Sequence, residues 1–307
     1  MKNKLLTRFR DNFPIGSFIR VGENKSINLY IGRDIEGRYS FDFRGVFIPL
    51  RIVGSSVIIV NHLKSDITKD IFLRFSLTKP ELLDCFCTFC LDIIDATSDV
   101  SDDKQAYKII CDRYFAWKKL FKANQGKLTE NDIMGLIGEL LFMRDYMLKN
   151  YSPIIALDSW TGPEPAHKDY SVNTTWYEVK TISAGKDSVK ISSLEQLDSD
   201  TEGTLVVYVL EKMSPTYNGI RINRLVTSIL DTVSTPLLRE LFLTKLTKIG
   251  FEFIPENDQF VYDVHKMSTY RVNNSFPKLS NKSIPLAINK VQYDIILGEI
   301  EQYKFTL

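Results

Sequence analysis

Residues 167–183, HKDYSVNTTWYEVKTIS, contain two carboxylates and an amine within an otherwise strand-like stretch. Asp169 lies near its start, and Glu178 and Lys180 lie near its end. Charged groups in a half-buried sheet cost free energy unless a partner or a bound ion compensates them. Two nearby carboxylates also repel each other unless a proton or a cation lies between them. A hard divalent cation such as Mg²⁺ suits this arrangement, because it takes carboxylate oxygens, waters and substrate phosphate as ligands.

A predicted β-hairpin positions these three residues. The runs 168–173 and 175–183 are strand-like and meet at an Asn-Thr pair, which favours two antiparallel strands. This hairpin brings Asp169 close to the point opposite Glu178. Because side chains alternate along a strand, four residues of the second run share one face: Trp176, Glu178, Lys180 and Ile182. An amine on that face can orient a water molecule or neutralise phosphate charge in a transition state.

A third carboxylate precedes the hairpin, in NDIMGLIGELLFMRDYMLKN. The apolar spacing predicts a helix over 130–149 with a wide buried stripe. Glu139 lies off the centre of that stripe, but its neighbours one turn away are mostly apolar. An isolated, partly buried Glu is costly, and a metal ion or a basic partner removes the cost. Gly135 and Gly138, which are weak helix formers, indicate that another backbone approaches this helix closely.

These residues resemble the PD-(D/E)XK nuclease superfamily, whose core is a mixed sheet flanked by helices. Four blocks follow the order seen in a bacterial family of PD-(D/E)XK motif proteins of undefined function: LIGELLFMRDY, ALDSWTGPE, HKDYSVNTTWYEVKT and VKISSLEQLD. Genes of that family tend to lie beside DNA methyltransferases and helicase-like ATPases in restriction or phage-defence clusters. The resemblance is strong over residues 130–200. One departure is Lys168, which stands where the superfamily's name has a proline.

The resemblance implies a Mg²⁺-dependent DNA endonuclease of a restriction or phage-defence system, with Mn²⁺ as an alternative ion. Its catalytic residues are Glu139, Asp169, Glu178 and Lys180. The three carboxylates would hold the metal together with the backbone carbonyl of Val179. Contacts to DNA would come from Lys190, Gln196 and His167. A DNA methyltransferase or a helicase-like ATPase is the implied protein partner, and homodimerisation is left open.

The same residues can also have purely structural roles. Asp169 can be a solvated residue at the end of the hairpin, Glu178 and Lys180 can form an ion pair, and Glu139 can bind a basic side chain. Lys190 and Gln196 can be ordinary surface residues, and His167 an ordinary turn residue. Two further functions therefore remain as alternatives: a non-catalytic DNA-binding or assembly subunit, and a structural protein with ion-paired acids.

Composition places few limits on the partner. The chain has 307 residues, of which 44% are hydrophobic and 25% charged, and its formal net charge is +1. This near-neutral charge means that a nucleic-acid site would need basic residues gathered locally. No apolar run approaches the ~20 residues of a membrane span, and the first residues lack the apolar core of a signal peptide. We therefore expect a soluble, cytoplasmic protein.

The cysteines allow two interpretations. Three of the four lie in ELLDCFCTFCLDII, where C-x-C-x-x-C spacing is compatible with zinc. The segment has helical apolar periodicity and lacks the Gly-rich turn that gathers thiolates around zinc. Reduced core cysteines are therefore the favoured interpretation.

The chain is predicted to be an α/β (α+β) protein in three parts. Five short runs over 17–77 predict a β-rich, antiparallel N-terminal accessory domain spanning residues 1–78. Residues 79–127 are predicted to be a helical connector, and residues 128–307 a PD-(D/E)XK nuclease-like domain. Within that domain we also predict a strand over about 153–160 and further strands at 188–192 and 204–211. Helices are predicted over about 221–233 and 236–248.

Overall fold

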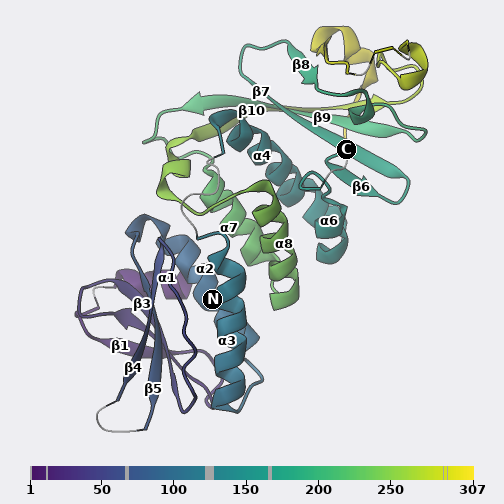
Figure 1. The fold of residues 1–307 in the computed structure, drawn as a ribbon. Helices are drawn as coiled ribbons and strands as arrows, with labels where there is room; N and C mark the ends of the chain where they lie inside the picture. Colours follow the sequence, from purple (N-terminus) through teal and green to yellow (C-terminus); the bar gives the residue numbers. More distant parts are fainter. Residues whose placement is uncertain are drawn as a thin grey trace. The chain divides into compact units, whose positions relative to one another are not determined.

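The computed structural model describes residues 2–11, 13–65, 69–121, 128–164, 168–285, 287–288 and 290–307. The chain forms two compact units (Figure 1). The first unit is Met1–Lys127 with Val226–Asn257, and the second is Leu128–Leu225 with Asp258–Leu307. The prediction of three domains, with boundaries after residues 78 and 127, stays a prediction. The two compact units divide the chain differently, because residues 226–257 belong to the same unit as the N-terminal residues.

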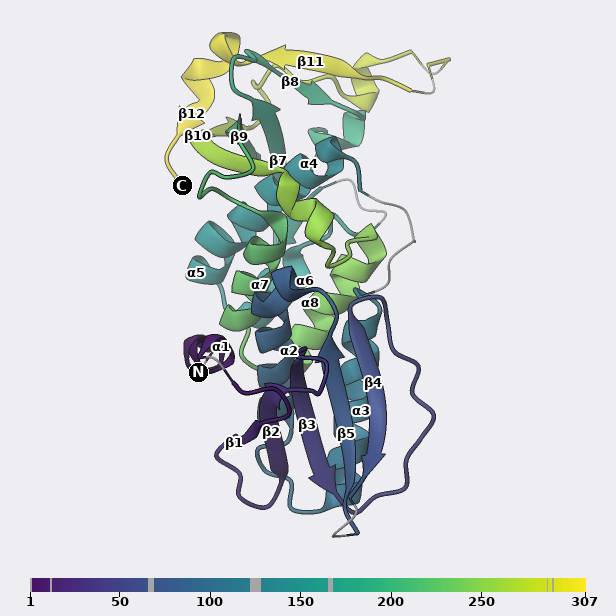
Figure 2. The same ribbon diagram turned by 90° about the vertical axis from the view of Figure 1, so that its left-hand side faces the viewer.

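The first unit contains the predicted antiparallel sheet. Its five strands follow the order β1-β2-β3-β5-β4, and every pairing is antiparallel. The strands are β1 (Phe18–Val21), β2 (Asn28–Arg33), β3 (Tyr39–Gly45), β4 (Ile58–Lys64) and β5 (Ile71–Leu77). Alternating apolar residues explain the sheet, because the side chains of one face enter the core and those of the other do not. Figure 2 shows this sheet with α3 behind it.

Helices complete the core of the first unit. They are α1 (Lys2–Arg10), η1 (Pro80–Leu82), α2 (Leu83–Ala96), α3 (Asp103–Lys118) and α8 (Pro236–Ile249), with the last part of α7 (Ile222–Thr232). A buried ion-pair network links α2, α3 and α8: Asp92 accepts from Arg113 at 2.8 Å, from Trp117 at 2.8 Å and from Arg239 at 3.3 Å. All four cysteines are free and buried, as predicted for core residues.

The second unit is built on a mixed sheet of order β12-β10-β9-β7-β6. Its strands are β6 (Tyr170–Val172), β7 (Thr175–Ser183), β9 (Gly203–Met213), β10 (Val261–Val272) and β12 (Lys304–Phe305). The β7–β9 pair is parallel and the other pairs are antiparallel. Together with the flanking helices, this mixed sheet gives the predicted α+β architecture (Figure 1).

The first elements of the second unit are helices. They are α4 (Glu130–Phe142), a π-helical turn η2 (Met143–Met147), α5 (Leu148–Asn150) and α6 (Pro153–Ser159). The predicted strand over about 153–160 is wrong, because this segment forms α6. Pro153 occupies its first turn, where a proline loses no hydrogen bond. Ser152 precedes it in extended conformation, so a helix start was present in the sequence.

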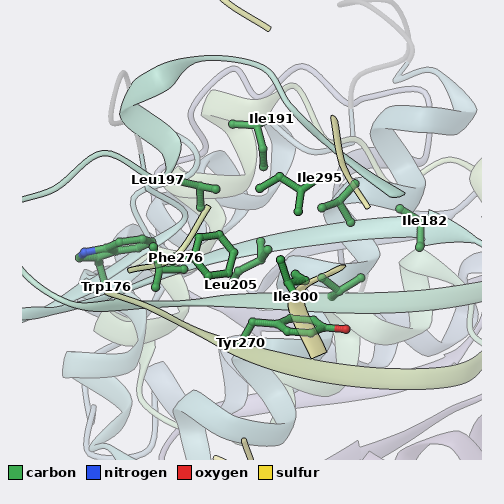
Figure 3. Packing of buried hydrophobic residues seen from close by; sticks show 12 residues of the cluster. Trp176, Ile182, Ile191, Leu197, Leu205, Tyr270, Phe276, Ile295 and Ile300 are labelled. Carbon is green, nitrogen blue, oxygen red and sulfur yellow. The ribbon is translucent and has the colours of Figure 1, made fainter. Parts of the chain in front are cut away.

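The other side of the sheet is covered by a small ribbon. Its strands are β8 (Ser188–Ile191) and β11 (Tyr293–Ile296), which pair antiparallel. The remaining short helices are η3 (Leu194–Gln196), η4 (Pro255–Gln259), η5 (Asn281–Ser283) and η6 (Leu297–Tyr303). Figure 3 shows the resulting apolar cluster, in which Trp176 and Ile182 of β7 pack with residues of the ribbon and η6. No helix of the described ranges is long and apolar enough to cross a membrane.

Candidate active site

Helix α4 carries Glu139 to the edge of the mixed sheet. Thr129 begins this helix with a capping box, in which its hydroxyl accepts from the Asp132 amide at 3.2 Å. Gly138, next to Glu139, lets the helix approach β7: a Cβ there would lie 2.0 Å from the Thr181 hydroxyl and 3.7 Å from a Val179 methyl. The expectation of a close approach is therefore correct for Gly138. Gly135 has no atom within 4 Å of its would-be Cβ, so the expectation is wrong there.

The predicted hairpin places Asp169 opposite Glu178. Tyr170 pairs with Tyr177 across the β6–β7 turn, so the next pair outward is Asp169 with Glu178. Asn173 makes the tight turn with a positive φ of 53°, which asparagine tolerates better than most residues. Oδ2 of Asp169 accepts from the amide of Val179 at 2.7 Å. The carboxylate is therefore fixed against the strand that bears Glu178.

Glu139 and Asp169 both lie close to the position that a side chain of Gly162 would take, which is here called the gap at Gly162. A Cβ on Gly162 would lie 2.7 Å from Oε2 of Glu139 and 3.5 Å from Oδ1 of Asp169. The Trp160 indole donates to Oε2 of Glu139 at 2.8 Å, and the Tyr170 hydroxyl donates to the Glu139 carbonyl at 2.8 Å. The absent side chain at Gly162 thus leaves space between two carboxylates that other residues hold in place.

Glu178 and Lys180 pair with each other. Nζ of Lys180 lies 2.9 Å from Oε1 of Glu178, and the Glu178 side chain is only 1% exposed. This is an ion-pair distance, but its alignment makes no hydrogen bond. Within the described part of the chain, neither Glu178 oxygen has a hydrogen-bond partner. A buried carboxylate with unsatisfied oxygens is costly, and a cation in contact with them would lower that cost.

Helix α4 packs on the face of β7 that bears Val179 and Thr181, whereas alternation along β7 places Glu178 and Lys180 on the opposite face. Asp169 links the two, because its carboxylate accepts from the Val179 amide, and burial together with its charge raises the pKa of both Glu139 and Glu178. Among the described residues, no group of three or more His, Cys, Asp and Glu side chains is arranged as a metal site. Two carboxylates around a gap do fit Mg²⁺, which usually keeps several waters and takes one or two protein carboxylates.

The pKa values of Glu139, Asp169 and Glu178 are all raised, chiefly by burial. Burial raises the pKa of Glu139, and the Asp169 charge raises it further, while the Trp160 hydrogen bond acts against both. Burial also raises the pKa of Asp169, opposed by the Val179 amide. Burial, with a contribution from Asp169, raises the pKa of Glu178 to about 8. A divalent cation bound to these carboxylates would favour their ionised forms and displace protons.

The residues predicted to touch DNA lie elsewhere in the second unit or outside the described residues. Lys190 is exposed on β8 opposite Asp294 of β11. Gln196 accepts from the Ser192 amide through Oε1 at 2.7 Å. His167 lies outside the residues that the structure describes. Val179 donates its amide to Asp169, and its predicted role as a carbonyl ligand stays a prediction.

Lys168, the departure from the superfamily pattern, is half-buried and bound to three carbonyl groups. Its amine donates to the carbonyls of Glu195, Gln196 and Asp198 at 2.6, 2.9 and 3.3 Å. It also lies 3.8 Å from the ring centre of Trp176, a cation–π contact. Burial lowers the pKa of Lys168 to about 8. The residue that replaces proline therefore ties the turn after β8 to the start of the hairpin.

Sequence reasoning missed the roles of Trp160 and Gly162. The available signal was the Trp-Thr-Gly-Pro run in the block ALDSWTGPE, which precedes the hairpin. The pairing of an indole with Glu139, 21 residues away, is a tertiary contact. No local pattern predicts such a contact.

The mixed sheet, its flanking helices and the carboxylate-lysine hairpin define a PD-(D/E)XK-like α/β fold. The family model described as "Putative PD-(D/E)XK family member, (DUF4420)" matches residues 10–298. The chain belongs to this family. Neither a curated protein nor a solved structure matches the chain.

Proposed function

We propose that the chain is a divalent-metal-dependent nuclease that hydrolyses phosphodiester bonds in DNA. The observation that carries this proposal is the gap at Gly162, flanked by Oε2 of Glu139 and Oδ1 of Asp169. Family membership supports nuclease chemistry of the PD-(D/E)XK kind. The unsatisfied oxygens of buried Glu178 add a third carboxylate close to this gap along the sheet.

Each residue of the proposed site has a separate role. Glu139 and Asp169 hold Mg²⁺ or Mn²⁺ from two sides, and Glu178 joins them once its pairing with Lys180 is broken. When bound, the ion supplies positive charge to phosphate oxygens and makes a water more acidic. Lys180, released from Glu178, donates to the attacking water or to a phosphate oxygen. The carbonyl of Val179 is proposed as a further ligand.

The substrate and setting follow from the resemblance to defence-associated relatives. We propose endonuclease cleavage of DNA in the cytoplasm, in a restriction or phage-defence system with a DNA methyltransferase or helicase-like ATPase. Lys190 and Gln196 would contact the DNA backbone. The net charge of +1 favours a protein that gains much of its DNA affinity from a partner or from homodimerisation.

Cleavage assays test this proposal. The purified chain is incubated with supercoiled plasmid, linear duplex, single-stranded DNA or RNA, with Mg²⁺ or Mn²⁺. We expect plasmid cleavage, and we expect Lys180→Ala and Asp169→Asn to slow it by about 100-fold or more. Lys186→Ala, an exposed lysine in the turn after β7, is the control and should cleave normally. The proposal fails if no substrate is cut with either ion, or if both site variants cut as fast as the wild type.

A second candidate function is a non-catalytic DNA-binding or assembly subunit. The ion pair between Lys180 and Glu178 at 2.9 Å favours it, because the Lys180 charge already offsets the charge of Glu178 without a metal ion. Calorimetric titration with Mg²⁺ separates the two candidates. Heat of binding that Asp169→Asn abolishes supports the nuclease, and no binding by the wild type supports the assembly subunit.

A further inference from the structure

The turn at Trp160–Gly162 donates hydrogen bonds to both Glu139 and Asp169. The amides of Thr161 and Gly162 both donate to the carbonyl of Asp169, at 2.9 and 3.2 Å. Trp160 also forms a β-bridge with Tyr170, the first residue of β6. The turn is therefore fixed to the hairpin by its backbone, while the Trp160 indole reaches Glu139 on α4.

Trp160 gives Glu139 a neutral partner only. The Trp160 side chain is fully buried and donates its indole N–H to Oε2 of Glu139 at 2.8 Å. Trp117 makes the same contact with Asp92 at 2.8 Å in the first unit, but Asp92 also binds the guanidinium of Arg113. Among the described residues, no basic side chain forms an ion pair with Glu139. The Glu139 carboxylate is therefore oriented by a neutral donor, as is common for carboxylates that ligate metals.

Gly162 is needed for space and not for backbone shape. Its φ lies outside the left-handed region, so an alanine can adopt the same backbone. A Cβ would nevertheless lie 2.7 Å from Oε2 of Glu139, 3.3 Å from the Trp160 indole nitrogen and 3.5 Å from Oδ1 of Asp169. One methyl group would thus occupy the gap between the carboxylates.

We propose that this turn sets the metal affinity of the site, with Trp160 as a positioning residue for Glu139 and Gly162 as the residue that keeps the ion's space open. This inference rests on the proposed function, because it assigns the gap to a divalent cation. The inference adds Trp160 and Gly162 to the three acids and the lysine of the proposed site. Neither added residue is a ligand of the ion.

Manganese binding to the full chain tests the proposal without an activity assay. Calorimetry gives the Mn²⁺ affinity, and thermal unfolding without metal reports the fold. We expect Gly162→Ala to bind Mn²⁺ at least about 10-fold more weakly, because partners that orient metal ligands typically contribute 10- to 100-fold. Its unfolding midpoint without metal reports what the shift of the Glu139 carboxylate costs the fold. Trp160→Phe should weaken binding by a similar factor and also lower the midpoint.

Two matched controls separate positioning from folding. Trp117→Phe removes the equivalent indole–carboxylate bond in the first unit, so it should lower the midpoint and leave Mn²⁺ affinity unchanged. Gly135→Ala adds a methyl group where a Cβ meets no atom within 4 Å, so it should leave Mn²⁺ affinity unchanged. Wild-type affinity in both Gly162→Ala and Trp160→Phe would overturn this inference alone. Absence of Mn²⁺ binding in the wild type would overturn it together with the proposed metal site.

Discussion

The Lys180 ammonium lies 2.9 Å from Oε1 of Glu178, whose side chain is 1% exposed. The two charged residues of the E-x-K stretch therefore pair with each other, beside the gap between Glu139 and Asp169. A metal ion that takes Glu178 as a ligand must compete with this amine. The protonation state of Glu178 decides how strong both interactions are.

Glu178→Gln should stabilise the protein at high pH. The pKa of this carboxyl rises from an ordinary 4.5 to about 8, chiefly through burial. A group with a raised folded pKa destabilises the fold progressively as pH rises from the unfolded pKa to the folded one, and fully above it. Glutamine does not ionise, so the gain should be small at pH 5 and largest near pH 9, with an upper limit of about 5 kcal/mol.

Urea unfolding at the two pH values measures this gain. Glu211→Gln, at an exposed position of β9, is the control and should change stability little at either pH. A Glu178→Gln variant that is equally or less stable than the wild type at pH 9 would contradict the predicted effect of burial on Glu178.

Gly138→Ala should destabilise the second unit, whereas Gly135→Ala should not. The added methyl group at Gly138 would lie 2.0 Å from Oγ1 of Thr181, and overpacking of this kind costs roughly 1–3 kcal/mol. Gly135 has open space, so alanine there should raise helix stability by up to about 1 kcal/mol.

A double variant checks the cause of the Gly138 effect. Thr181→Ala removes the clashing hydroxyl, which has no hydrogen-bond partner among the described residues. Gly138→Ala with Thr181→Ala should therefore recover most of the lost unfolding free energy. No recovery would show that the helix–strand contact is not the reason for glycine at this position.

Lys168→Met should lower the unfolding free energy by about 2 kcal/mol, because it leaves carbonyl groups without a donor. The lost bonds run from the Lys168 amine to Glu195, Gln196 and Asp198. The measurement is urea unfolding beside Lys186→Met, an exposed lysine of the same unit. Equal stability of the two variants would mean that Lys168 does not anchor the turn.

Local sequence patterns predicted the hairpin well. The Asn-Thr turn and the alternation along β7 place Asp169 opposite Glu178 and put Trp176 and Ile182 in one apolar cluster. The strand predicted over about 153–160 was wrong, because Pro153 opens a helix there. Short apolar runs fit both periods, so flanking residues should have decided this segment.

Contacts between distant residues were not predictable from local patterns. The Lys168 amine donates to a carbonyl group 30 residues away. The Trp160 indole donates to Glu139, which lies 21 residues earlier in the chain. The sequence also does not state which face of β7 is covered by α4. It therefore could not decide whether Glu178 pairs with Lys180 or faces a metal ion.

The crystal structure of the protein with Mn²⁺, located by its anomalous signal, tests the central claim most directly. We predict one ion in the gap at Gly162, about 2.1 Å from oxygens of Glu139 and Asp169, with Glu178 separated from Lys180. An ion bound elsewhere, or an empty gap with the Glu178–Lys180 pair intact at saturating Mn²⁺, would contradict the account.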